Sequence, residues 1–239
     1  MRPRIGFFIL WLAFADGCST QSAGGAYSEM TDDERAKQAL DEGRFDDAID
    51  IYTPLIEAEP ENYSRHPLLA AALAARAGID LVGSMAGGTG ESGGGSAFDA
   101  LGQFVPTSPT DEQMTDLDSA IATLEAMPEA HRNGDGTYDY SAGAALQLTL
   151  YQTMRSIMLV NRFAVRTDTG SIDPTSLQNM SDEEVAAVLD GLAAAAASSP
   201  DSVQGQAINT VLSQTLAGVD EQEGETRKDK LIAYMSRTS

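Results

Sequence analysis

Few residues in this chain of 239 could perform nucleophilic or metal chemistry. Cys18 is the only cysteine, and His66 and His131 are the only histidines. One thiol can form neither an intrachain disulfide nor a cysteine-based zinc cluster, and two imidazoles are too few for histidine-rich metal or triad chemistry. The chemistry left to Cys18 is modification of its own sulfur, and its place in the chain indicates which kind.

The residues before Cys18 follow the order of an export signal. Arg2 and Arg4 precede an apolar run over residues 5–15, and small residues come after it. This run is shorter than the roughly 20 residues that a membrane-spanning helix needs. We therefore expect residues 1–17 to be a signal peptide and not a permanent transmembrane anchor.

The sequence Ala-Asp-Gly-Cys over residues 15–18 resembles the lipobox of bacterial lipoproteins. Asp16 departs from that pattern, because the family usually has a small uncharged residue there. The resemblance implies that Cys18 carries fatty acyl chains such as palmitate, and that residues 18–29, rich in Ser and Gly, tether a domain to a membrane. Ser19 stands where inner-membrane lipoproteins typically have Asp. The resemblance therefore implies the periplasmic face of the outer membrane, with a soluble periplasmic protein as the alternative.

The charge of the chain is strongly acidic, with 15 Lys and Arg against 36 Asp and Glu and a formal net charge of -21. A surface of this sign repels phosphate backbones and anionic lipid, which disfavours nucleic-acid binding and electrostatic docking on membranes. Hydrophobic residues make up 42% of the chain, enough for a sizeable core. The composition therefore predicts a folded, acidic protein.

Apolar residues recur at spacings of three and four in several segments, while no segment shows sustained alternation, which predicts an all-α chain. Thr31 with Glu34 and Ser181 with Glu184 have the spacing of a capping box, the usual start of a helix. Three of the expected helices have apolar stripes that should face the core. These stripes are Met114, Leu117, Ile121 and Leu124, then Val185, Val188, Leu189 and Leu192, and, in the helix that begins at Pro200, Ile208, Val211, Leu212 and Leu216. Apart from the helix that begins at Pro200, the expected helices cover residues 30–42, 45–59, 63–82, 110–127, 141–165, 181–197 and 227–235.

The segment 43–60 resembles the second half of a tetratricopeptide (TPR) repeat. The residues that carry the likeness are Gly43, Phe45, Ala48, Ile49, Tyr52 and Pro60. Pro54, Leu55 and Asp32 depart from the family pattern. The resemblance implies TPR-like antiparallel helix pairs over residues 30–82, in an α-solenoid or helical bundle.

Because such repeats bury their faces only against neighbours, the rest of the chain must complete the core. Residues 110–239 are expected to form a C-terminal helical region packed on the repeats, after a Gly/Pro-rich insertion over 83–109. Within that insertion, residues 83–96 contain seven glycines and no positive charge. No Gly-Lys-Ser/Thr follows and no strand precedes them, so a flexible insertion is favoured over a phosphate-binding loop.

The turn at residues 133–139 is a weak calcium candidate, with Asn133, Asp135 and Asp139 as its oxygen ligands. Counted from His131 or from Asn133, the twelfth position of a calcium loop is Ala142 or Ala144, and neither is a ligand. A polar turn that leads into the next helix is the favoured interpretation. We expect no resident metal or cofactor.

The predicted function is binding without catalysis, since the carboxylates fall on helix faces and first turns and neither histidine has a catalytic neighbour in sequence. We expect a membrane-anchored helical-repeat scaffold that holds a protein or peptide partner of the cell envelope. The alternative is a periplasmic solute-binding component of a transport system, with residues 83–96 as a lid. The candidate partner-binding residues are Arg44, Tyr63, Arg65 and Arg76, because cations are scarce and aromatics are natural anchors.

Overall fold

The computed structural model describes residues 30–79, 102, 104–133, 137–167, 171–200 and 202–238, and Thr31–Ser239 form one compact unit. The predicted signal peptide, Cys18, the tether and the glycine-rich segment 83–96 lie outside the described residues. Among those that are described, no helix is both long and apolar enough to cross a membrane.

The fold is all-α, as the hydrophobic spacing predicts. A two-stranded antiparallel sheet joins β1 (Val165–Arg166) to β2 (Ile172–Asp173), and short 3-10 turns η1 (Tyr63–Arg65) and η2 (Pro174–Asn179) precede helices. The α-helices are α1 (Asp32–Asp41), α2 (Phe45–Ala58), α3 (His66–Arg76), α6 (Asp111–Glu125), α7 (Glu129–Arg132), α8 (Ser141–Asn161), α9 (Asp182–Ser198), α10 (Val203–Asp220) and α11 (Arg227–Thr238).

Capping boxes fix where the helices begin, and both predicted boxes are confirmed. The Thr31 backbone N–H donates to the Glu34 carboxylate at 2.8 Å, and the Glu34 N–H donates to the Thr31 hydroxyl at 3.2 Å. Ser181 and Glu184 make the same exchange before α9, and Thr110 makes it with Gln113 before α6. Each box satisfies backbone donors that the first helical turn leaves unpaired.

Two of the predicted helices are too long at their C-terminal ends. The helix expected over 63–82 ends at Arg76, because Gly78 takes a left-handed conformation with φ of 88° and Ile79 N–H bonds back to the Ala74 carbonyl at 3.0 Å. The helix expected over 141–165 ends at Asn161, and the chain turns into β1. In both cases the backbone makes a local hydrogen-bond pattern in place of the next helical hydrogen bonds.

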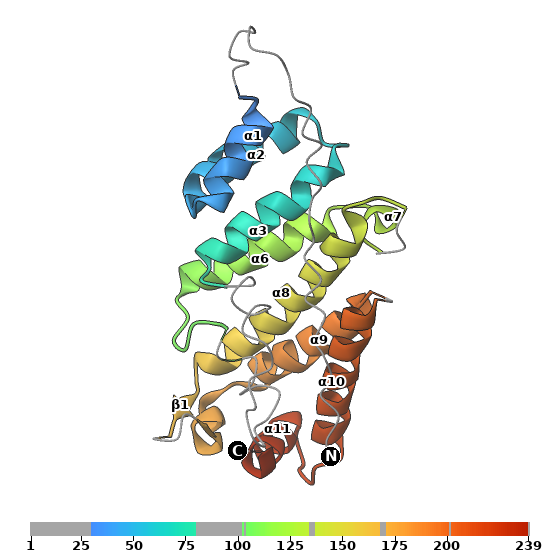
Figure 1. Cartoon of the computed structure of the whole chain (residues 1–239). Coiled ribbons are helices and arrows are strands. Elements are labelled where there is room, and N and C mark those ends of the chain that lie inside the picture. The colour runs from blue at the N-terminus through green and yellow to red at the C-terminus, as the bar shows by residue number, and fades with distance from the viewer. Residues whose placement is uncertain are drawn as a thin grey trace, which may run out of the picture. The chain divides into compact units, whose positions relative to one another are not determined.

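The long helices from α1 to α10 pack mainly on the helices next to them in the chain, and α11 packs on η2, α9 and α10. Helix α2 lies between α1 and α3, then α3 packs on α6, α6 on α8, α8 on α9, α9 on α10 and α10 on α11 (Figure 1). The buried faces form one continuous hydrophobic core. Such nearest-neighbour packing is the arrangement by which helical repeats bury their faces. The membership of the TPR family itself stays a prediction.

The apolar stripes predicted to face inward are mostly buried. Met114, Leu117, Ile121 and Leu124 of α6 are all buried, as are the corresponding residues of α9. The prediction is wrong at Val211, whose residue is 41% exposed, because α10 buries only the side that carries Leu212, Thr215 and Val219.

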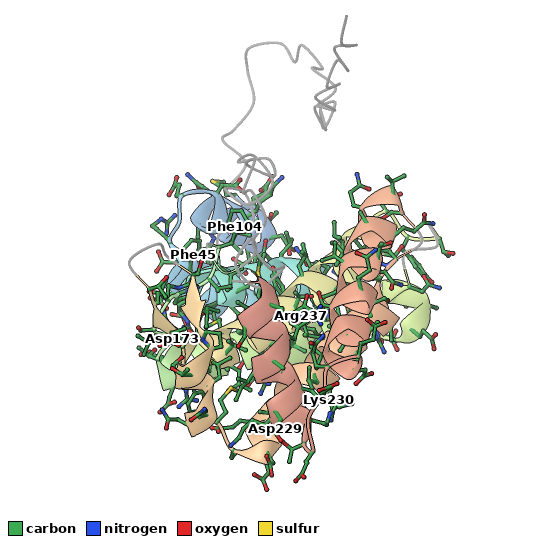
Figure 2. The ribbon with its side chains drawn as sticks, turned by 90° about the horizontal axis from the view of Figure 1, so that it is seen from below. Phe45, Phe104, Asp173, Asp229, Lys230 and Arg237 are labelled. Atoms are coloured by element: carbon green, nitrogen blue, oxygen red, sulfur yellow. The ribbon has the colours of Figure 1, made fainter. Side chains whose placement is uncertain are left out.

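The last helix is held by cations that donate to backbone and amide oxygens. Lys228 donates to the carbonyls of Gln178 and Met180, and Lys230 donates to the Asp220 carbonyl at 3.0 Å. Arg237 donates to the Gln222 side-chain oxygen at 3.0 Å. Figure 2 shows Lys230 and Arg237 on the same helix. These bonds satisfy carbonyls that the ends of η2 and α10 leave without helical partners.

Helices α8 and α9 lie close together at Gly191. A Cβ atom built at Gly191 would overlap the hydroxyl oxygen of Ser156 on α8, which itself donates to the Gln152 carbonyl at 3.1 Å. Gly143, near the start of α8, has open space around the same position. The packing of α8 on α9 therefore requires a glycine at position 191, whereas position 143 has room for a side chain.

We expect Gly191→Ala to lower the free energy of unfolding by about 1–3 kcal/mol through overpacking of the α8–α9 contact. Gly143→Ala should instead raise it by about 0.5 kcal/mol, because alanine loses less conformational freedom in a helix than glycine does. Urea unfolding followed by circular dichroism measures both changes.

The double variant Gly191→Ala with Ser156→Ala is the matched control, since it removes the oxygen atom that the new methyl group meets. It should recover part of the lost stability. Equal effects of alanine at positions 191 and 143 would show that Gly191 is not a packing constraint.

Candidate functional site

Both histidines of the chain lie in one cluster of rings with three tyrosines. We call Tyr63, His66, His131, Tyr138 and Tyr140 the aromatic cluster. The Tyr63 ring centroid lies 4.5 Å from that of His131 and 5.4 Å from that of His66. The His131 ring stacks on Tyr138 at 4.0 Å, and Tyr138 stacks on Tyr140 at 5.6 Å. Residues 68 positions apart in sequence thus meet in one group.

Helix breaks bring the two halves of the cluster together. Pro60 follows the end of α2, and Tyr63 and His66 begin η1 and α3. Pro128 follows the end of α6, and His131 lies in the short helix α7. The Ser141 hydroxyl at the start of α8 donates to the Tyr138 carbonyl at 2.8 Å, which fixes the turn that carries Tyr138 and Tyr140. The cluster therefore joins the α2–α3 connection to the α7–α8 connection.

Hydrogen bonding and burial give the rings different environments. The Nδ1 atom of His131 and the hydroxyl of Tyr140 are 2.6 Å apart. Burial, with smaller contributions from Tyr138 and Tyr63, raises the pKa of Tyr140. His66 is only 6% exposed, and its Nδ1 atom has no hydrogen-bond partner among the described residues. Tyr63, His131, Tyr138 and Tyr140 are half-buried, so part of their surface faces solvent.

The four residues that precede Tyr63 in the chain line an open hollow on the surface. Its volume is about 570 Å³, and it is lined by Glu59, Pro60, Glu61 and Asn62. Glu61 is exposed. Asp139, which lies between Tyr138 and Tyr140 in sequence, is also exposed. Half-exposed aromatic rings beside carboxylates can bind a ligand by packing and charge, without any bond being made or broken.

Comparisons of this chain with protein families, with curated proteins and with solved structures find no match. Function must therefore be inferred from the residues and their geometry.

Arg65 and Arg76, predicted as partner contacts, donate within the protein. The guanidinium of Arg65, a residue only 7% exposed, donates twice to Asp33, at 2.8 Å each, and to the Leu55 carbonyl at 3.0 Å. Arg76 donates to both carboxylate oxygens of Asp116, at 2.6 and 2.9 Å, and to Asp46 at 3.0 Å. These two arginines tie neighbouring helices together.

The other two predicted contacts lie on the surface. Arg44 is exposed and pairs with Glu42 and Asp47, its neighbours in the chain. Tyr63 belongs to the aromatic cluster beside the hollow. Of the four predicted residues, Tyr63 alone is part of a group of rings that comes from distant parts of the sequence.

Two of the three residues of the calcium candidate, Asn133 and Asp139, are described by the structure. Asp135 lies outside the described residues, and Asp139 is exposed. Over the described ranges, no group of three or more His, Cys, Asp or Glu side chains could hold a metal ion. Asn133 and Asp139 flank the same turn, but the calcium site stays a prediction.

Sequence reasoning missed four members of the cluster, namely His66, His131, Tyr138 and Tyr140. Each looks ordinary by itself, at a helix start or in a polar turn. The available signal was compositional, since both histidines and three of the seven tyrosines occur at just two helix breaks. Which breaks meet in space cannot be read from local spacing.

Replacement of Arg76 by Met is expected to lower the free energy of unfolding by about 2 kcal/mol. The variant leaves the Asp116 carboxylate, whose side chain is 9% exposed, without its two charged donors. The loss is smaller than for a fully buried pair because the Arg76 side chain is 37% exposed. Urea unfolding followed by far-ultraviolet circular dichroism measures the change.

Arg44→Met removes the same charge where the pairs are exposed and local, so stability should stay nearly unchanged. The double variant Arg76→Met with Asp116→Leu should recover part of the loss, because it also removes the unpaired carboxylate. A loss as small for Arg76→Met as for Arg44→Met would contradict the structural role of Arg76.

The stability of the protein should fall as the pH decreases through about 6.5, in part because of His66. Burial, opposed by a weaker effect of the Asn62 backbone, lowers the pKa of His66 in the folded chain. The unfolded chain then takes up a proton near pH 6.5, while the folded chain takes it up only at lower pH. Protonation thus favours unfolding in this window. We expect His66→Gln to reduce the loss of unfolding free energy between pH 7.5 and 5.5.

Unfolding in urea at pH 8.5, 7.5 and 5.5 provides the measurement and its reference. Between pH 8.5 and 7.5 the native protein and His66→Gln should change alike, since His66 is neutral in both states there. An equal loss for the two proteins between pH 7.5 and 5.5 would show that His66 does not contribute.

Proposed function

We propose that this protein is a lipid-anchored component of the bacterial cell envelope, held on the periplasmic face of the outer membrane, that binds a protein or peptide partner. The export pattern of residues 1–17 and the lipobox-like position of Cys18 support the anchor. The stacked helices and the aromatic cluster support the binding role. No catalytic step is part of the proposal.

The aromatic cluster is the observation that carries the binding proposal. Tyrosine rings bury a large area when they contact a partner, and each has only two side-chain torsions to fix. Here the rings are already held by stacking and by the 2.6 Å contact between His131 and Tyr140. A partner would therefore meet a surface that loses little conformational freedom on binding.

The arrangement of the helices agrees with a scaffold. Stacked helix pairs present their outer faces in sequence and bind partners on an extended surface. The connection that carries Tyr63 and the hollow directly follows the segment 43–60 that resembles a TPR repeat, and it joins α2 to α3. Open hollows of this kind suit a peptide segment better than an enclosed small molecule.

A photo-crosslinking amino acid at position 63 tests the proposal in intact cells. The substituted full-length protein should fractionate with membranes and should form a crosslinked product of defined mass with an envelope protein. In the Cys18→Ser background the protein should move to the soluble fraction, because the acyl chains supply the membrane affinity.

The same crosslinker at Gln204 is the matched control, because this exposed position of α10 is remote in sequence from the cluster. It should not give the product formed from position 63. Unchanged membrane fractionation of Cys18→Ser would contradict the anchor, and identical products from positions 63 and 204 would contradict a binding surface at Tyr63.

A further inference from the structure

The surface around Tyr63 has an unbalanced charge. Glu61, Glu129 and Asp139 are exposed, and each lies within two residues of a ring of the aromatic cluster. Glu59, which also lines the hollow, already pairs with Arg65 at 3.1 Å. Exposed carboxylates thus flank members of the aromatic cluster in sequence on both connections.

The positive groups near this surface are engaged inside the protein. Arg65 is buried and bound to Asp33 and the Leu55 carbonyl. Arg132 donates from its Nε atom to the Met127 carbonyl at 3.1 Å and keeps its positive charge, which offsets one of the three exposed carboxylates. Burial lowers the pKa of His66, so its ring is neutral near pH 7 and adds no opposing charge. The charge next to the rings is therefore mainly that of carboxylates.

Tyrosine rings and carboxylates attract the same class of group. The face of a phenol ring carries negative electrostatic potential and binds a guanidinium or ammonium group, and a nearby carboxylate adds Coulomb attraction. An acidic segment would be repelled both by these carboxylates and by a chain with a net charge of -21. Charge complementarity thus selects a cationic occupant.

We propose that the partner is recognised through an Arg-rich or Lys-rich segment, one cationic side chain of which packs on Tyr63 beside Glu61. This inference rests on the proposed function and names the chemistry of the partner. The His66 ring lies 5.4 Å from the Tyr63 ring, and its buried Nδ1 atom has no partner at normal hydrogen-bond geometry among the described residues.

Fluorescence anisotropy with labelled hexa-arginine tests this inference on the full-length protein in a non-ionic detergent at 0.15 M salt. Hexa-citrulline has nearly the same shape without the charge, and hexa-glutamate has the opposite charge. Hexa-arginine should bind saturably with a stoichiometry of one, and the other two peptides should bind at least tenfold more weakly. Comparable binding of hexa-citrulline would overturn the inference.

Single substitutions separate the site from general attraction to an acidic protein. Tyr63→Leu should weaken hexa-arginine binding about five- to tenfold, whereas Tyr63→Phe, which keeps the ring, should change it less than twofold. Glu61→Gln should weaken binding about threefold. Glu183→Gln removes the same charge at an exposed position of α9 and should have no effect beyond twofold.

Two results would reject the inference outright. If Tyr63→Leu binds as the native protein does, the ring is not used, and if Glu183→Gln matches Glu61→Gln, attraction is not localised. Circular dichroism shows whether Tyr63→Leu is folded, and Glu61→Gln, at an exposed position, supplies the test if it is not. If hexa-arginine binding fails these tests but position 63 still gives a specific crosslink, the cationic partner is rejected and the proposed function is kept.

Discussion

A shortage of positive charge is the constraint on which the helix stack depends. With 36 carboxylates and only 15 basic residues, the chain repels itself, and each cation gains most where it bridges two elements. Arg76 bridges α3 to both α2 and α6, and Arg65 ties η1 to α1. Further pairs that join elements distant in sequence are Arg155 with Asp118, Arg162 with Asp111, and Arg227 with Asp190.

This use of the cations also determines which carboxylates remain exposed. Pairs with a buried member, such as Arg65 or Asp116, hold the core helices in place, whereas exposed pairs contribute little. Within the described part of the chain, exposed carboxylates for which no such pair is found include Glu61 and Asp139. The same use of the cations between helices leaves exposed carboxylates next to members of the aromatic cluster in sequence, which is the basis for proposing a cationic partner.

The position of the aromatic cluster follows from the helix breaks. Pro60 and Pro128 follow the ends of α2 and α6, two helices that both pack on α3. Packing on a shared neighbour brings the connections that follow them together, so Tyr63 and His131 meet. Tyr63 and Tyr140 pack against the hydrophobic core. A surface on rigid elements loses less conformational entropy when it binds a partner than a surface on a free loop does.

The sequence by itself determined the helices, because hydrophobic spacing, capping boxes and proline breaks act within a few residues. It also placed Met114, Leu117, Ile121 and Leu124 in the core. The structure shortened α3 and α8 through local backbone features, the left-handed Gly78 after α3 and the turn into β1 after α8. Only the tertiary structure decided the exposure of Val211 and the partners of Arg65 and Arg76. The contacts of both histidine rings with three tyrosine rings also appear only in the tertiary structure. These features depend on contacts between residues tens of positions apart, which local patterns do not encode.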